Sequence, residues 1–195
     1  VIGRDFQDIN RITGIEKDSY SFDMLGEAAR TESQANDYFL AYKAAIKDVY
    51  DINEKHKNNN GVSIKISALS SKYQMLNETH IKNKLMPRLE SLIDFAFQKD
   101  VEVTFDAEEQ DRLSVSLELI GSILSKKKYK DWSNIGMVVQ AYGKRSLEVI
   151  DWVEDALKNR APIHIRLVKG AYWDYEIKQS QVKSHTGYSV YTNKS

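Results

Sequence analysis

The chain has 195 residues, of which 42% are apolar and 29% are charged, a composition typical of one soluble domain with a sizeable core. Lysine and arginine together number 28, as do aspartate and glutamate, so the formal net charge of zero indicates no overall attraction to nucleic acid or to an anionic membrane. The absence of cysteine excludes disulfides, thiolate nucleophiles and cysteine-ligated metals.

The sequence predicts strands and helices in strict alternation. In chain order the predicted elements are a strand SYSFDML, a helix over 31–50, a polar surface loop over 51–60, a strand VSIKIS, a helix over 87–98, a strand VEVTFD, a helix over 109–124, a strand IGMVVQAY, a helix over 144–159 and a strand IHIRLVK. Such alternation favours βαβ units and a parallel sheet.

The helices are predicted from apolar residues that recur at steps of three and four. At the start of the first helix, Thr31 and Gln34 have the spacing of a capping box. The last helix has an apolar face made of Leu147, Ile150, Val153 and Leu157. Each helix therefore has one side that is expected to pack on the sheet.

The strands carry apolar residues on one face and polar residues on the other. In the last strand Ile163, Ile165 and Leu167 are expected to pack against helices, while Arg166 faces the opposite side. A doubly wound sheet would cover both faces with helices, so this pattern favours an α/β barrel whose interior holds the ligand. Because a complete barrel has eight strands, we expect a partial (β/α)8 TIM-like barrel of about the first five βα units, with its C-terminal units missing.

Several polar residues at these strands are candidates for chemistry. Lys65 lies in mid-strand and faces inward in a barrel, although a strand lysine more commonly points into water from an edge. Asp106 and Glu108 follow VEVTF, where the acidic run DAEEQD is also typical of a capped helix N-terminus. Gln140 is equally compatible with a satisfied polar core residue. Arg166 requires a buried partner or a ligand anion, because it lies in an apolar strand.

Other common site motifs are absent from the sequence. The four histidines form no metal-binding pair or cluster: they are His56, His80, His164 and His185. The chain contains no GxGxxG or GxxxxGK[ST] phosphate loop and no Gly-x-Ser-x-Gly elbow. A dinucleotide, if bound, is not held as in a Rossmann fold.

Six motifs in order resemble one enzyme family. They are FDMLGEAA, SIKISAL, FDAEEQDRL, VVQAYGKR, RLVKGAYWDYEIK and GYSVYT. They are similar to those of the flavin-dependent proline dehydrogenases, and in particular to the dehydrogenase domain of bacterial bifunctional proline utilization A. The resemblance implies a distorted (β/α)8 barrel that holds FAD noncovalently, oxidises L-proline to Δ1-pyrroline-5-carboxylate and passes electrons to membrane quinone.

The resemblance also implies which residues form the site. Those expected to be catalytic are Lys65, Asp106, Arg166 and Tyr172. Those expected to contact FAD are Asp106, Val138, Gln140, Arg166, Val168, Lys169, Gly170, Ala171, Tyr172, Trp173, Tyr191 and Thr192. The substrate pocket is expected to contain Lys65, Leu167 and Tyr172, with Lys65 pairing with the substrate carboxylate and no metal present. Cations near the flavin, such as Arg166 and Lys169, would stabilise the negative charge of the reduced ring.

The family's last three βα units, which carry an arginine pair that grips the substrate carboxylate, have no counterpart in this sequence. We therefore expect residues 1–195 to be the N-terminal part of the barrel domain, cut from a longer protein, binding FAD weakly or not at all and turning over no proline. The open barrel edge is a candidate surface for oligomerisation. The resemblance implies a cytoplasmic parent protein that associates peripherally with the inner membrane, and this segment does not indicate nucleic acid as a partner.

Two other functions are compatible with the residues. One is a flavin barrel enzyme that acts on another amine. The other is a non-catalytic barrel fragment that serves assembly or partner binding.

Overall fold

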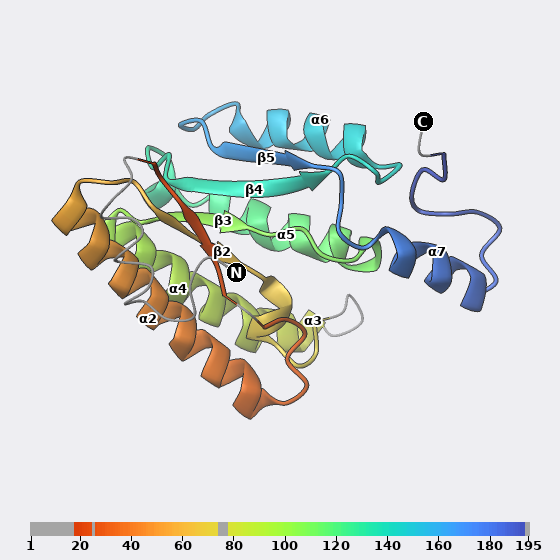
Figure 1. Cartoon of the computed structure of the whole chain (residues 1–195), viewed down its shortest axis with the longest axis horizontal. Coiled ribbons are helices and arrows are strands. Elements are labelled where there is room, and N and C mark those ends of the chain that lie inside the picture. Colours follow the sequence, from red (N-terminus) through yellow and green to blue (C-terminus); the bar gives the residue numbers. More distant parts are fainter. Residues whose placement is uncertain (1–17, 25, 74–77, 194–195) are drawn as a thin grey trace. The chain divides into compact units, whose positions relative to one another are not determined.

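The computed structural model describes residues 18–24, 26–73 and 78–193, which divide into two compact units (Figure 1). The first unit ends at Phe105 and the second begins at Asp106. The chain has an α/β fold with a parallel five-stranded sheet, in the order β1-β2-β3-β4-β5. All five predicted strands and the parallel sheet are thereby confirmed, while closure into a barrel stays a prediction.

The first unit alternates strands and helices. Its elements are β1 (Ser21–Asp23), α2 (Glu32–His56), β2 (Gly61–Ile64), the 3-10 helix η1 (Ile66–Leu69), α3 (Glu78–His80), the π-helix η3 (Ile81–Leu85), α4 (Met86–Lys99) and β3 (Glu102–Phe105). Strand β2 pairs in parallel with β1 and with β3, so that Val62 lies between Phe22 and Val103. The predicted helix over 87–98 differs from α4 by one residue at each end.

Helix α2 begins as predicted and ends later. The Thr31 side chain accepts a hydrogen bond from the Gln34 backbone N–H at 3.1 Å, which is the expected N-cap. The helix then continues to His56, so the prediction of a loop from residue 51 was wrong. Buried Ile52 extends the apolar face of the helix by one more turn, and Lys57 ends it in the left-handed conformation.

The core of the first unit lies where α2 and α4 pack on each other and on the strands. Its fully buried side chains come from both helices and from β2 and β3: Tyr42, Ile46, Val49, Leu89, Leu92, Ile93, Val62, Ile64, Val103 and Phe105. Burying one such aliphatic or aromatic side chain stabilises a fold by roughly 1.5–3 kcal/mol. This packing holds the C-terminal end of β2, where Lys65 follows.

The second unit contains the last two strands. Its elements are the 3-10 helix η4 (Gln110–Arg112), α5 (Leu113–Leu124), the 3-10 helix η5 (Lys127–Tyr129), β4 (Ile135–Gln140), α6 (Ser146–Leu157), β5 (His164–Val168) and α7 (Trp173–Val182). Strands β4 and β5 pair in parallel, and α6 packs on β4. The predicted helices over 109–124 and 144–159 correspond to α5 and α6, each with shorter α-helical bounds.

The predicted packing faces of α6 and β5 were partly wrong. Helix α6 buries Val149 and Val153, one turn apart, whereas Leu147 is 69% exposed. On β5, Ile165 and Leu167 are 43% and 65% exposed, although both were expected to pack against helices. Hydrophobic periodicity indicates a helix or a strand, but the neighbouring elements decide which apolar residues are covered.

Within the described part of the chain, no helix combines the length and the apolar character needed to cross a membrane.

The contact between α2 and the end of β2 can be tested with Tyr42→Phe. This change keeps the buried ring but removes the hydroxyl that accepts the Lys65 backbone N–H at 3.0 Å. We expect the free energy of unfolding in urea to fall by about 1–2 kcal/mol, because a part-buried donor loses its acceptor. Tyr50→Phe is the matched control on the same helix, since its ring keeps its place under the Lys99 ammonium. Equal stability of the two variants would contradict this account.

Candidate functional site

The register of β4 and β5 brings four predicted site residues together in the second unit. Val138 pairs with Arg166, and Gln140 pairs with Val168. Because side chains alternate along a strand, these four residues lie on one face of the strand pair. The sequence predicted this face from its polar residues, and the parallel register places the residues side by side.

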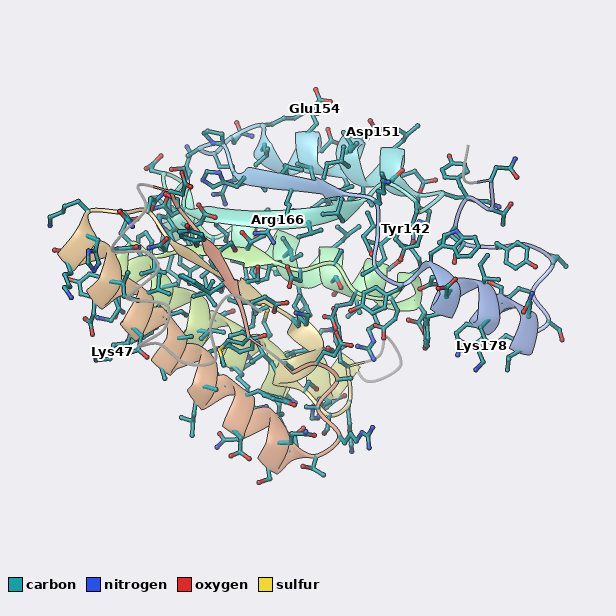
Figure 2. The ribbon with its side chains drawn as sticks, in the orientation of Figure 1. Lys47, Tyr142, Asp151, Glu154, Arg166 and Lys178 are labelled. Carbon is teal, nitrogen blue, oxygen red and sulfur yellow. The ribbon has the colours of Figure 1, made fainter. Side chains whose placement is uncertain are left out.

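Arg166 has a partner of opposite charge. Its guanidinium Nη1 lies 3.6 Å from Oδ1 of Asp106, whose side chain is 15% exposed. An arginine in an apolar strand needs such a partner, because an isolated buried charge is costly. The Arg166 side chain, labelled in Figure 2, is 40% exposed, so it is not fully enclosed by the protein.

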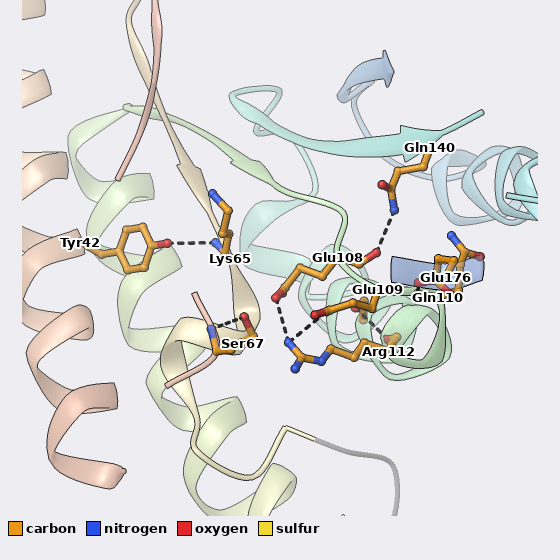
Figure 3. A network of polar contacts seen from close by, with 11 residues as sticks. Tyr42, Lys65, Ser67, Glu108, Glu109, Gln110, Arg112, Gln140 and Glu176 are labelled. Atoms are coloured by element: carbon orange, nitrogen blue, oxygen red, sulfur yellow. Dashed lines mark hydrogen bonds and ion pairs between the residues drawn. The ribbon is translucent and has the colours of Figure 1, made fainter. Parts of the chain in front are cut away.

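Two further carboxylates of the acidic run DAEEQD pair with an arginine, while Asp111 lies 3.8 Å from the Lys183 ammonium. Neither η4 nor α5 has a side-chain hydrogen bond at its N-cap, so the expected side-chain cap was wrong, although Asp111 does lie in the first turn of η4, where the helix dipole favours an acidic residue. Glu108 and Glu109 each place a carboxylate oxygen 3.2 Å from Nη1 of Arg112 (Figure 3). The Glu108 side chain is buried, and this charge-assisted contact offsets its desolvation.

Gln140 links two loops through its side-chain amide. Its Nε2 donates to the backbone carbonyl of Glu108 at 2.8 Å, and its Oε1 accepts from the Ala171 backbone N–H at 3.2 Å (Figure 3 shows the first contact). The residue is only 8% exposed. Gln140 is therefore a satisfied buried polar residue, and it connects the loop that follows β3 with the loop that follows β5.

The turn after β5 depends on a glycine. Gly170 has φ +125°, a conformation that disfavours other residues, and a Cβ at this position would lie 1.5 Å from Cδ1 of Tyr142. The Tyr142 backbone N–H donates to the Lys169 carbonyl at 2.9 Å. Gly170 was expected to let the backbone approach a cofactor closely. In the structure its backbone packs closely against the ring of Tyr142.

A cavity of about 860 Å³ lies next to this turn in the second unit. Its lining residues are Ala141, Tyr142, Lys144, Lys169, Gly170, Trp173, Tyr191, Thr192 and Asn193. We call this cavity the β5-turn pocket. It combines two lysines with aromatic side chains, which suits an anionic ligand that carries a ring.

The β5-turn pocket contains only some of the predicted cofactor residues. Lys169, Gly170, Trp173, Tyr191 and Thr192 line it, and Trp173 Nε1 donates to the Tyr191 carbonyl at 2.8 Å. The predicted residues that do not line it are Asp106, Val138, Gln140, Arg166, Val168, Ala171 and Tyr172.

Sequence reasoning missed four lining residues: Ala141, Tyr142, Lys144 and Asn193. Each of them is close in the sequence to a residue that was predicted to contact the cofactor, and this adjacency could have identified them. Ala141, Tyr142 and Lys144 follow β4 directly, and Asn193 follows Thr192.

Tyr142 has an unusual protonation equilibrium. Burial and, to a smaller extent, the nearby Glu176 carboxylate raise the pKa of its hydroxyl to about 12. Polar groups of Gln110 and Gln140 oppose this rise. Tyr142 therefore stays protonated at neutral pH and acts in the pocket wall as a neutral aromatic.

Lys65 belongs to the first unit and follows β2 instead of lying in mid-strand. Its side chain is 14% exposed, and its Nζ lies 2.5 Å from Oδ1 of Asp23. A water-facing edge lysine is therefore the wrong description. Of the other predicted substrate residues, Leu167 is largely exposed and Tyr172 is half-buried at the N-terminus of α7. No cluster of three or more His, Asp or Glu residues suited to a metal occurs in the described ranges.

A family model of proline dehydrogenase matches residues 8–195. The chain belongs to the proline dehydrogenase family. It is homologous to the proline dehydrogenase domains of the PutA proteins, at 43% identity over 178 residues to the bifunctional protein PutA of Klebsiella aerogenes, a match that covers 90% of this chain. It is 31% identical over 153 residues to proline dehydrogenase 1 of Bacillus subtilis, covering 78% of this chain and 43% of that protein.

Among solved structures, PutA from Bdellovibrio bacteriovorus, inactivated by N-propargylglycine, superposes with a TM-score of 0.89 at 29% identity. That match covers 100% of this chain and 22% of the other. The chain spans 14% of the length of the Klebsiella aerogenes PutA.

The Gln140 link can be tested with Gln140→Glu. At neutral pH a carboxylate can still accept from Ala171 N–H, but it faces the Glu108 carbonyl without a proton to donate. We expect the free energy of unfolding to fall by roughly 1–3 kcal/mol, as for other lost buried hydrogen bonds. Gln181→Glu, at an exposed position of α7, is the matched control. If urea titrations gave both variants the same midpoint, the link would contribute nothing to stability.

Proposed function

We propose that this chain is the N-terminal part of a (β/α)8 barrel that oxidises L-proline to Δ1-pyrroline-5-carboxylate with FAD, passing the electrons to a membrane quinone. The observation that carries the proposal is the match to the proline dehydrogenase family over residues 8–195. The names of relatives add support, because they include both bifunctional PutA proteins and a separate proline dehydrogenase.

The β5-turn pocket has the chemistry to hold part of an FAD molecule. Its volume of about 860 Å³ lies within the range of small-molecule sites, roughly 300–1,000 Å³. Lys144 and Lys169 can pair with a diphosphate, while Trp173 and Tyr191 offer aromatic surface to a ring. When bound, the flavin supplies the capacity to accept a hydride.

Arg166 and Asp106 are proposed to act as a unit. The carboxylate holds the guanidinium beside β4, so the cation is oriented before any ligand arrives. A fixed cation beside a redox ring stabilises negative charge that develops there. It also disfavours a protonated amine nearby, and only a neutral amine of proline can give up a hydride.

Lys65 is proposed to anchor the substrate carboxylate, with Tyr172 and Leu167 in the pocket wall. The largely buried side chain of Lys65 and its ion pair with Asp23 restrict the motion of the ammonium. The Lys65 ammonium has three N–H donors, so it can bind a substrate carboxylate in addition to the carboxylate of Asp23.

We propose that the 195-residue chain alone binds FAD weakly or not at all and turns over no proline. The family's remaining βα units, with their arginine pair, would complete the site. The exposed Ile165 and Leu167 on β5 support an open edge that another part of a barrel, or a second copy, would cover. The complete protein is proposed to be cytoplasmic and to associate peripherally with the inner membrane, where the quinone lies.

A chimera tests the proposed reaction. The matching segment of Klebsiella aerogenes PutA is replaced by this chain, and proline-dependent quinone reduction is measured together with flavin content. We expect a yellow, active chimera in which Arg166→Met lowers kcat by roughly 100-fold or more, because a charge-stabilising donor is lost. Arg145→Met, at a half-exposed surface pair with Glu148, is the control.

Two outcomes would contradict parts of this proposal. A folded chimera that binds flavin but oxidises a different amine in place of proline would refute the substrate. A yellow and active 195-residue chain would refute the incompleteness of the isolated segment.

A further inference from the structure

Glu176 is a buried carboxylate with two partners from distant segments. It lies in α7 and is only 6% exposed. Its Oε1 accepts from the Gln110 backbone N–H at 2.8 Å, a contact drawn in Figure 3. Its Oε2 accepts from the Ser189 hydroxyl at 3.0 Å. The carboxylate thus joins η4, α7 and the segment near residue 189.

The position of Glu176 in the helix does not by itself account for its burial. An acidic residue in the first turn is favoured by the helix dipole, and Asp174 satisfies that preference at an exposed position. Burying a carboxylate is costly unless hydrogen bonds replace its hydration. Both oxygens of Glu176 are used in this way, each by a different segment, which is the arrangement expected of a residue that holds segments together.

The segment held by Glu176 forms one wall of the β5-turn pocket. Ser189 is followed by Val190, which is fully buried, and then by Tyr191 and Thr192, which line the pocket. On the other side, Trp173 starts the same helix that carries Glu176.

Two backbone hydrogen bonds connect this segment to the turn after β4. The Lys144 N–H donates to the Ser189 carbonyl at 3.0 Å, and the Tyr191 N–H donates to the Tyr142 carbonyl at 2.9 Å. These two amide protons therefore report whether the wall is in place.

We infer that Glu176 is a positioning residue for the β5-turn pocket: it fixes residues 189–192 against α7 and η4, and so sets the placement of Tyr191 relative to Trp173. The inference rests on the proposed function for the identity of the ligand, but the placement of the wall is a property of the chain alone. The effect of the Glu176 charge on the pKa of Tyr142 agrees with this location beside the pocket.

Hydrogen exchange on the 195-residue chain, without added cofactor, tests the placement. In Glu176→Ala we expect the Lys144 and Tyr191 amides to exchange roughly 10- to 100-fold faster, because hydrogen bonds to a charged group are lost. Glu176→Gln keeps an acceptor for Gln110 and an NH₂ donor for the Ser189 oxygen, so protection should return to within about threefold of the parent. Glu154→Gln, at an exposed position of α6, is the control that should change neither amide.

The titration of Tyr142 is a second measurement, and it distinguishes the location of Glu176 beside the pocket from a general effect on protein stability. Glu176→Gln removes the negative charge near Tyr142, so the pKa of that tyrosine should fall from about 12 towards its ordinary value while remaining raised by burial. The ultraviolet titration of tyrosinate, with Tyr142→Phe as reference, measures this shift. A merely structural contact elsewhere would leave the Tyr142 titration unchanged.

The outcomes are decisive for the positioning role. Unchanged exchange at both amides in a folded Glu176→Ala protein would overturn it. If Glu176→Ala does not fold, Ser189→Ala removes one contact only, and it should raise exchange at the same two amides by roughly threefold to tenfold; no change would again overturn the inference.

FAD titration of the same proteins separates this inference from the proposed function. Weaker FAD binding in Glu176→Ala than in Glu176→Gln would support both. If the parent chain binds no FAD at all, as the proposed incompleteness of the isolated segment allows, the exchange and tyrosine measurements still decide the role of Glu176.

Discussion

The side-chain amide of Gln140 is the contact on which the geometry of the second unit depends. A buried amide must satisfy both its donor and its acceptor, and here the two partners are backbone groups of different loops, at Glu108 and Ala171. That requirement holds the loop after β3 close to the loop after β5. Asp106, at the start of the first loop, can therefore meet Arg166 of β5 as an ion pair.

Buried polar contacts continue from this link to the β5-turn pocket. Glu108 is held by Arg112, and Gln110 donates its N–H to Glu176, which in turn accepts from Ser189. Networks of this kind are costly when one member is unsatisfied, so they favour a single arrangement of the loops. A pocket whose walls are fixed in advance loses less entropy when it binds a ligand. The loops of the second unit therefore have an irregular backbone but hold defined positions.

The sequence was a good guide to the elements and a weaker guide to their packing. The five strands and four helices were predicted from hydrophobic periodicity, and Thr31 was correctly placed as a cap. The end of α2 was misplaced because the polar residues after Tyr50 lie on the outer side of a helix that still buries Ile52. The exposure of Leu147 and Leu167 was missed because periodicity identifies an apolar face without specifying what covers it. Among pocket residues, Tyr142 and Lys144 were missed although they adjoin predicted contacts.

By itself, the sequence determined the alternation of strands and helices, the family, and the need for a partner at Arg166 and a bare backbone at Gly170. These are local properties, set by side-chain period, charge and conformational freedom along a few residues. Only the tertiary structure decided that the partner is Asp106, that the ring against Gly170 is Tyr142, and that Glu176 reaches Ser189. Such pairs join segments far apart in the chain, so they depend on strand register and on the placement of loops, which local sequence does not encode.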